Sequence, residues 1–270
     1  MPFAHASSML RLPTLAAVAG LLLFACASAS QPTTPRARPA VGTIDRAASR
    51  ALIERTNAQR TQRGLQPLRR DARLDSIACR HSRDMLARNY MGHVSPDGVR
   101  PDDRGARFHR TLIGGFGENV WSLSGADLRG DALAAQAMRG WMNSPGHRAN
   151  ILSPDYTHLG ACIVHQGRQS YRGTQFFARA AAYLADPLPY RWQPGAMQAV
   201  RVQPQGSRPA PTFYAFDDGG ADKPMKYTFN DTLRAPQTPG TYRLELWFLS
   251  SRQGDYQYYD VAKGPRIRVR

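Results

Sequence analysis

Residues 141–152 read WMNSPGHRANIL. Apolar residues recur at helical spacing up to Trp141, which predicts a helix over 131–143 with its apolar side facing inward. The Ser-Pro-Gly tripeptide then interrupts the helical pattern and turns the chain. We therefore expect His147 to follow a tight turn at the end of a packed helix.

Three other segments carry polar side chains of the kind found in binding and catalytic sites. Residues 90–98 read YMGHVSPDG, residues 117–120 read GENV and residues 173–177 read GTQFF. Each is weak by itself, because a lone loop histidine is usually structural and a Gly-Glu-Asn turn is usually a cap. Their order along the chain, together with the 141–152 stretch, is much more specific.

In this order the four segments resemble one family, the CAP superfamily (cysteine-rich secretory proteins, antigen 5 and plant pathogenesis-related proteins), in its bacterial SCP-like branch. The resemblance covers about residues 48–184. Asn57 and Arg60 on the first expected helix and His81 on the second continue the pattern. The resemblance implies an α+β fold, an α–β–α sandwich over residues 44–185.

The resemblance also implies a cavity, which in this sequence would be lined by His93, Glu118, Ser144 and His147. His93 and Glu118 fall on the family's first histidine and first glutamate. Ser144 stands where eukaryotic members have a second glutamate, and Arg172 stands where they have a second histidine. His147 belongs to the Ser-Pro-Gly-His-Arg turn of bacterial members and is the expected second imidazole.

Family members can hold a divalent cation in this cavity, which makes His93, Glu118 and His147 the expected metal ligands. Two imidazoles and one carboxylate suit zinc, with a fourth position left for water. The loss of one carboxylate disfavours calcium, which prefers several oxygen ligands. The alternative is a hydrogen-bonded polar network that fixes the loops without a metal.

Two functions are compatible with these residues. The first is a binding module for an apolar ligand such as a lipid or sterol, for a divalent cation, or for an envelope partner, because the family includes lipid-binding members. The alternative is a metal-assisted, protease-like hydrolase with His93, Glu118 and His147 as its catalytic residues. A Ser–His–Glu relay through Ser95 or Ser144 is a further option. The sequence has neither H-E-x-x-H nor G-x-S-x-G, so we favour binding.

Five apolar side chains surround the Gly114–Gly115 pair: Phe108, Leu112, Ile113, Phe116 and Trp121. If they are exposed together, they form a patch that marks a ligand or partner site. If they are buried, they belong to the core.

The N-terminus has the pattern of an export signal. Residues 1–29 combine a positively charged start with an apolar run that is too short to span a membrane comfortably. The tetrapeptide LFAC resembles a lipobox ending at Cys26, which predicts lipidation there and a membrane anchor. Cleavage after Ala29 would instead release a secreted or periplasmic protein. Residues 30–43 are rich in proline and predict a flexible linker.

The chain of 270 residues carries a formal net charge of +16, with 33 arginines and three lysines. The basic residues are spread along the chain instead of forming one lysine-rich patch with aromatics, so we expect no nucleic-acid partner. The arginine-rich region between Arg36 and Arg73 is suited to anionic envelope components. A single apolar run long enough to meet a membrane excludes a polytopic membrane protein.

Residues 186–270 differ from the rest because prolines punctuate them and short alternating runs replace the helical period. Six short strands predict a small all-β immunoglobulin-like sandwich, serving as a spacer or a protein-binding module. Cys79 and Cys162 are the cysteines outside the export signal. In an oxidising compartment they are candidates for a disulfide, and the alternative is two free buried thiols.

Overall fold

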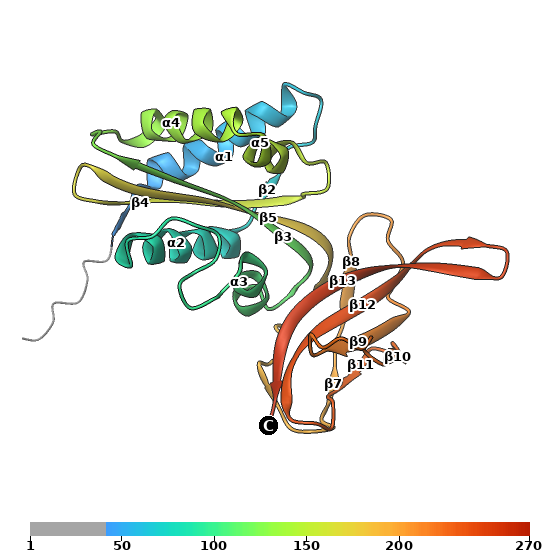
Figure 1. Ribbon diagram of the computed structural model, residues 1–270. Coiled ribbons are helices and arrows are strands. Elements are labelled where there is room, and N and C mark those ends of the chain that lie inside the picture. Colours follow the sequence, from blue (N-terminus) through green and yellow to red (C-terminus); the bar gives the residue numbers. More distant parts are fainter. Residues whose placement is uncertain (1–41) are drawn as a thin grey trace, which may run out of the picture. The chain divides into compact units, whose positions relative to one another are not determined.

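The computed structural model describes residues 42–270 (Figure 1). The predicted signal peptide (1–29), its Cys26 and most of the predicted linker (30–43) lie outside the described residues. Helices and strands alternate up to residue 185. The helices are α1 (Arg46–Thr61), α2 (Ala72–Ala87), α3 (Pro101–Phe108), α4 (Gly130–Asn143) and α5 (Pro145–Leu152). The strands are β1 (Thr43–Ile44), β2 (Arg69–Arg70), β3 (Leu112–Ser124), β4 (His158–Gln166) and β5 (Ser170–Leu184).

These strands form one sheet in the order β1-β4-β5-β3, with antiparallel neighbours. β4 and β5 make a hairpin across Gly167, whose φ of 62° favours glycine. β2 adds in parallel to β4, and β8 (Val202–Pro204) pairs with the end of β5. β3 lies at the end of this order, so side chains from both of its faces can meet at its free edge.

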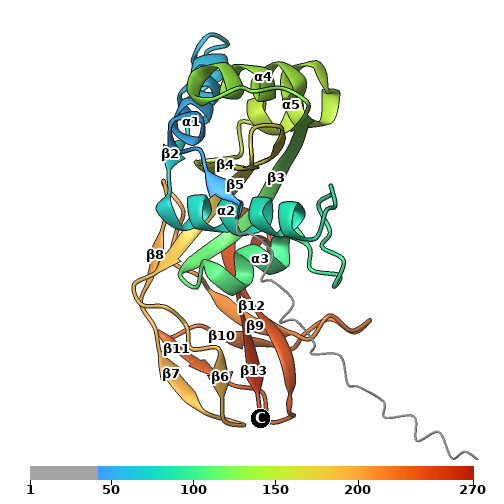
Figure 2. The same ribbon diagram turned by 90° about the vertical axis from the view of Figure 1, so that its left-hand side faces the viewer.

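Helices cover both faces of the sheet (Figures 1 and 2). Because strand residues alternate between faces, β4 contributes Leu159 and Ile163 to a core beneath α1 and α4, and Cys162 and Val164 to a core beneath α2. On the neighbouring strand β5, Phe177 belongs to the first core, and its sequence neighbour on the opposite face belongs to the second. The α+β fold and its three α–β–α layers are therefore confirmed for this part of the chain.

α1 and α2 both begin directly after an aspartate. Oδ1 of Asp45 accepts a hydrogen bond of 2.8 Å from the Ala48 amide. Oδ1 of Asp71 accepts from the amides of Arg73 and Leu74 at 2.7 and 3.3 Å. These caps satisfy amides that have no partner within the helix and so fix where each helix starts.

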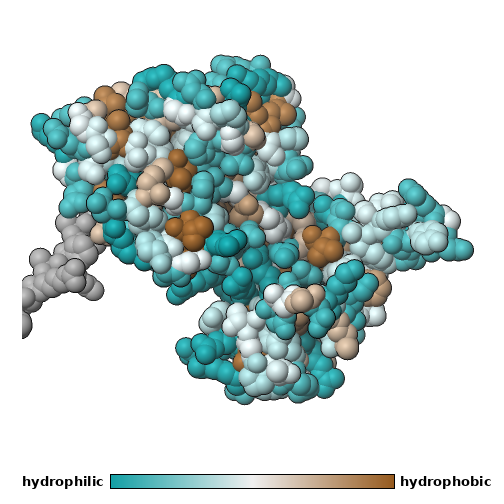
Figure 3. Space-filling model, in the orientation of Figure 1, coloured by the Kyte–Doolittle hydropathy of each residue, from teal (hydrophilic) through white to brown (hydrophobic). Residues whose placement is uncertain are grey.

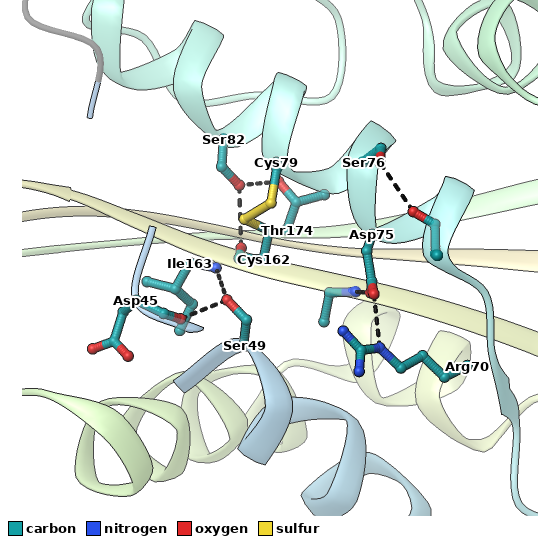
Figure 4. The surroundings of a disulfide bond; sticks show 12 residues. Asp45, Ser49, Arg70, Asp75, Ser76, Cys79, Ser82, Cys162, Ile163 and Thr174 are labelled. Atoms are coloured by element: carbon teal, nitrogen blue, oxygen red, sulfur yellow. Dashed lines mark hydrogen bonds and ion pairs between the residues drawn. A yellow bond between two sulfur atoms is a disulfide. The ribbon is translucent and has the colours of Figure 1, made fainter. Parts of the chain in front are cut away.

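A disulfide fastens α2 to the sheet (Figure 4). It joins Cys79, in the middle of α2, to Cys162 on β4. One turn further along α2, the Ser82 hydroxyl donates to the Cys162 carbonyl at 3.3 Å and to the Thr174 hydroxyl at 2.8 Å. The helix is therefore held against the sheet by a covalent bond and by buried hydrogen bonds.

The C-terminal part is rich in strands. Its strands are β6 (Arg191–Trp192), β7 (Met197–Ala199), β9 (Phe213–Asp217), β10 (Lys226–Thr228), β11 (Thr232–Arg234), β12 (Gly240–Gln253) and β13 (Tyr256–Val269). Five form a sheet in the order β10-β9-β12-β13-β6, and β7 pairs only with β11. The predicted immunoglobulin-like sandwich is not confirmed, because β8 joins the first sheet through β5 instead of completing a second C-terminal sheet.

One buried cluster unites the C-terminal sheet with the ends of β3 and β5. Ile113, Ala182 and Leu184 pack in the same core as Leu244 and Phe248 of β12. The described residues consequently behave as one compact unit. Within residues 42–270, no helix combines the length and the apolar character that a membrane span requires.

The face of the molecule shown in Figure 3 is largely hydrophilic, with apolar residues scattered over it. Of the five apolar residues around Gly114–Gly115, Leu112 and Ile113 are fully buried in β3, Phe116 and Trp121 are partly buried, and Phe108 is exposed. Most of these side chains therefore belong to the core and do not form a shared exposed patch.

Candidate functional site

Glu118 lies in the middle of β3, and its side chain is only 1% exposed. The strand alternation directs Glu118 toward α2 and α3, and it directs the next residue, Asn119, to the opposite face. There the Asn119 side-chain amide donates to the His147 carbonyl at 3.1 Å. Because β3 is an edge strand, its two faces bring groups from α3 and α5 to the same border of the sheet.

Both carboxylate oxygens of Glu118 are engaged. Nδ1 of His93 lies 2.9 Å from Oε1, and Nη2 of Arg104 lies 2.8 Å from Oε2. Nε2 of His81 lies 3.6 Å from Oε1. A buried carboxylate is costly unless it is paired, and the Arg104 side chain, which is 5% exposed, supplies the opposite charge.

Arg104 also organises the loop that carries His93. Its Nη2 donates to the His93 carbonyl at 2.7 Å, and its Nη1 donates to the Val99 carbonyl at 3.0 Å and the Ser95 hydroxyl at 3.2 Å. One guanidinium on α3 thus fixes residues 93–99 and the carboxylate of Glu118 together. The planar donor set of arginine suits such a multiple contact.

His93 is half exposed, with 46% of its side chain accessible. A carboxylate accepts hydrogen bonds, so Nδ1 of His93 carries the hydrogen and Nε2 is the acceptor nitrogen. The ring of His147, in the first turn of α5, lies near it, with centroids 6.4 Å apart and planes tilted by 49°. Partial burial lowers the pKa of His147, and the neighbouring His93 adds to this effect.

His81 forms the inner wall of the site. Its Nε2 lies 3.0 Å from the Gly92 carbonyl, and its side chain is fully buried. Burial lowers the pKa of His81; the charge of Glu118 opposes this, and the charge of Arg104 adds to it. A neutral His81 therefore supports the loop by hydrogen bonding instead of adding a second buried charge.

The structure brings His93, Glu118 and His147 close together: His93 contacts Glu118, and the ring centroids of His93 and His147 lie 6.4 Å apart. Ser144 is the residue at which α4 ends and α5 begins, and no hydrogen bond in the described chain links its side chain to His93 or Glu118. Arg172 on β5 is buried, and its Nε donates to the Tyr90 carbonyl at 3.3 Å. Arg172 therefore supports the start of the His93 loop.

Sequence reasoning missed Arg104 as a site residue and treated His81 only as a family mark. Arg104 follows the acidic start of α3 and precedes Gly105 and Ala106, both of which are buried. An arginine among buried small residues of a short helix is the one sequence signal that could have indicated an inward-facing guanidinium.

The residues fit a divalent cation less fully than the sequence suggests. Glu118 already has partners on both oxygens, including a cation, so it is not a free ligand. Within residues 42–270, no group of three or more His, Cys, Asp or Glu side chains is arranged to hold a metal ion. The available donors are Nε2 of His93 and the imidazole of His147, and Glu118 orients the first of them.

A Ser–His–Glu relay is not formed by the described residues. The Ser95 side chain is buried, and its hydroxyl contacts Tyr90 and Arg104, not His93. The His93 nitrogen that faces Glu118 is Nδ1, so a nucleophile would have to meet Nε2 at the exposed side of the ring.

Comparison with known proteins gives the family to which this part of the chain belongs. The sequence profile of the cysteine-rich secretory protein family, CAP, matches residues 53–179. Residues 53–179 belong to the CAP superfamily. His93, Glu118 and His147 all lie within this CAP domain, whereas the C-terminal sheet follows it.

Two Bacillus subtilis (strain 168) proteins are similar to the CAP domain. The uncharacterized protein YkwD is 35% identical over 116 residues, which are 43% of this chain and 42% of that protein. The uncharacterized membrane protein YlbC is 36% identical over 120 residues, which are 44% of this chain and 32% of that protein. The chain thus spans less than half the length of either relative.

A solved structure is also similar in sequence, that of an extracellular protein containing an SCP domain from Bacillus anthracis str. Ames. It is 31% identical, with 56% of this chain and 45% of that chain covered and a TM-score of 0.40.

Proposed function

We propose that this protein is an exported binding module, and that the neighbouring histidines His93 and His147 bind a divalent transition-metal cation, zinc above all. The N-terminal pattern supports export, either as a lipoprotein modified at Cys26 or as a soluble chain cleaved after Ala29. The disulfide supports it too, because such bonds persist mainly in oxidising compartments.

The observation that carries this proposal is the hydrogen bonding of His93, which leaves one ring nitrogen accessible. Its Nδ1 is occupied by the buried Glu118, so its exposed Nε2 is the nitrogen available to a ligand. Metal-binding histidines typically donate a hydrogen bond from their other ring nitrogen to a carboxylate in this way, which fixes the ring and raises its basicity. His147 offers a second imidazole beside it.

The same geometry favours binding over hydrolysis. A general base must reach the water it activates, and the carboxylate of Glu118 is buried with both oxygens engaged. A bound zinc ion would supply Lewis acidity and further coordination positions at the surface. With two protein ligands, those positions suit a donor group presented by a partner molecule.

Calorimetric titration with zinc at pH 7.5 tests the proposal. His93→Ala and His147→Ala should each abolish the one-to-one binding that the unaltered chain shows. His165→Ala is the matched control, because His165 is a partly exposed histidine on β4 that contacts the Gly167 carbonyl. The proposal fails if the unaltered chain does not bind zinc or if all three variants bind it equally.

A groove between α1 and α4 suits an amphiphilic ligand as a second candidate, because its lining combines two methionines with several polar side chains. It encloses about 320 Å³ and is lined by Arg55, Ala58, Gln59, Gln62, Ala135, Met138, Arg139, Met142 and Asn143. Methionine adapts to irregular apolar ligands, and Arg139 is suited to a carboxylate head group, whereas Arg55 is already paired with Asp131. A fatty acid such as oleate should then bind the chain and its His93→Ala variant equally, and Met142→Lys should lose it. Equal binding to Met142→Lys would exclude this groove.

A further inference from the structure

α3 connects the surroundings of His93 and His147 to the C-terminal sheet. It has eight residues, and it contributes Arg104 to the contacts with Glu118 and the His93 loop. The two residues before Arg104, Asp102 and Asp103, contact the C-terminal part of the chain. Three consecutive residues therefore link the two regions within a single helical turn.

The firmest of these contacts is an ion pair at the start of α3. Nη2 of Arg266, on β13, lies 2.7 Å from Oδ1 of Asp103. The other oxygen of Asp103 accepts a hydrogen bond of 3.2 Å from the Arg100 amide. Asp103 therefore holds the N-terminus of α3 and fastens it to β13 at the same time.

A second arginine of the C-terminal sheet faces the same turn. Arg243 on β12 is buried; its Nε donates to the Gly264 carbonyl at 2.7 Å, and its Nη1 lies 3.8 Å from Asp102. Its Nη2 is buried without a hydrogen-bond partner among the described residues. A buried guanidinium with incomplete partners is strongly attracted to the nearest carboxylate, which is that of Asp102.

The far end of α3 is held as well. Arg110 donates through Nε to the Leu188 carbonyl at 2.8 Å and through Nη1 to the Arg266 carbonyl at 2.6 Å. Burial lowers the pKa of Arg110 to about 10, which still leaves it charged at neutral pH. Both ends of the helix are thus attached to the chain beyond residue 185.

We propose that the C-terminal sheet positions the His93–His147 site through α3, with Arg266 as the main positioning residue and Arg243 as its support. This inference rests on the proposed binding role of that site. A short helix moves as a rigid body, so release of its first turn displaces Arg104, and with it the His93 loop and the orientation of Glu118.

The alternative is that packing alone places α3. Gly105 lies against Phe116 of β3 so closely that an added Cβ would come within 2.3 Å of the ring. If this contact suffices, the C-terminal arginines have no influence on the site. The two explanations make different predictions for a variant that removes Arg266 and leaves Gly105 intact.

The test compares Arg266→Gln with Arg268→Gln in the full chain. Arg268 is exposed on the same strand, two residues further on, which makes it a matched control. Amide hydrogen exchange is measured in residues 93–99 and in α1. Loss of a partly exposed ion pair should speed exchange of 93–99 by up to about fivefold and leave α1 unchanged. Arg266→Lys keeps the charge and should restore the slow exchange. If the effect came from lost side-chain packing, Arg266→Lys would not restore it.

Zinc titration of the same variants completes the test. Arg266→Gln should weaken binding by up to about fivefold, and Arg268→Gln should not. Equal exchange and equal affinity in the two variants would overturn the inference. If the unaltered chain binds no zinc but Arg266→Gln still loosens residues 93–99, the proposed ligand is wrong and the positioning role stands.

Discussion

An imidazole–carboxylate pair lies beside each end of α2, and the two pairs differ in their exposure to solvent. Beside its C-terminal end, Nδ1 of His93 lies 2.9 Å from the carboxylate of Glu118. At its N-terminal end, Nε2 of His109 lies 2.9 Å from the carboxylate of Asp71. Each pair joins an imidazole to a carboxylate from a different part of the chain. The difference between them lies in which member is accessible to solvent.

In the first pair the carboxylate is buried and the histidine is half exposed; in the second the histidine is fully buried and the carboxylate is 17% exposed. Nδ1 of His109 faces the Thr111 hydroxyl at 3.5 Å, and that hydroxyl accepts from Arg73 at 2.8 Å. His109 therefore has no nitrogen to offer a ligand, whereas His93 has one. A histidine–carboxylate contact indicates a binding site only when the second nitrogen reaches the surface.

The largest effect is expected from Glu118→Ala. Removal of the carboxylate leaves Arg104 buried without its counter-charge, which should cost about 3–5 kcal/mol of unfolding free energy. Urea denaturation measures this cost. The paired replacement Glu118→Leu with Arg104→Met should cost clearly less, because no unpaired charge remains. Equal losses of unfolding free energy in Glu118→Ala and in the double variant would show that the unpaired charge of Arg104 does not cause the destabilisation.

Loss of the disulfide should affect both ends of α2 alike. The bond closes a loop with a sequence separation of 83 residues. Replacing Cys79 and Cys162 by serine should therefore lower the unfolding free energy by about 2–4 kcal/mol. Amide exchange at the two ends of α2 should rise by similar factors. A rise confined to one end would mean that the other end is held independently of the bond.

Acid should remove the stabilisation that Asp71 provides at the N-terminal end of α2. Burial alone would raise the pKa of Asp71, but hydrogen bonds from His109 and from the amides of Arg73 and Leu74 outweigh it and lower the pKa to about 2. Because the unfolded value is about 3.9, this stabilisation is complete above pH 4 and is lost as the pH falls toward 2. It should amount to about 2–3 kcal/mol, at about 1.4 kcal/mol per pKa unit.

Unfolding measured across this range should show the loss in the unaltered chain, and Asp71→Asn should remove that part of the pH dependence. If Asp71→Asn shows the same dependence of unfolding free energy on pH as the unaltered chain, groups other than Asp71 cause the acid sensitivity.

The smallest change in stability is expected at His93, although its loss should have the greatest effect on zinc. His93→Ala should lower the unfolding free energy by less than about 1 kcal/mol, because water can replace the half-exposed imidazole as a hydrogen-bond donor to Oε1 of Glu118. His109→Ala should cost about 1–2 kcal/mol, because it removes the partner of Asp71. Zinc should still bind to His109→Ala. If His93→Ala and His109→Ala are equally stable, the proposed difference between the His93–Glu118 pair and the His109–Asp71 pair does not hold.

Much of the CAP domain follows from local patterns. Helical spacing up to Trp141 predicts the helix that the structure shows as α4, which ends at Asn143. The grouping of His93, Glu118 and His147 follows from segments whose order is characteristic of the family. In these cases the information lies in short stretches of sequence.

The contacts that decide the character of the site are long-range and have no such pattern. Arg104 and Glu118 are 14 residues apart, and Asp71 and His109 are 38 residues apart. Each pair meets because α2, α3 and β3 pack together, and no spacing rule relates a loop or helix residue to a partner on a strand. The expected ligand Glu118 becomes an orienting group for this reason.

The C-terminal part shows how strand patterns fail. Apolar side chains alternate over 242–248 in the sequence, whereas β12 runs from Gly240 to Gln253. Its pairing with β13 shifts register between Arg243 and Glu245 and again between Leu249 and Ser251. The second shift coincides with the point from which residues 250–253 are all polar and exposed, so the apolar alternation ends before the strand does.

The core that unites β3 and β5 with the C-terminal sheet has a consequence for heating and for truncation. Ile113, Ala182 and Leu184 are covered by side chains such as Leu244 and Phe248. A chain that stops at residue 185 would present these apolar groups to water, and such copies would adhere to one another. The intact chain should instead melt in one calorimetric transition, because neither sheet can lose its packing while the other keeps its own.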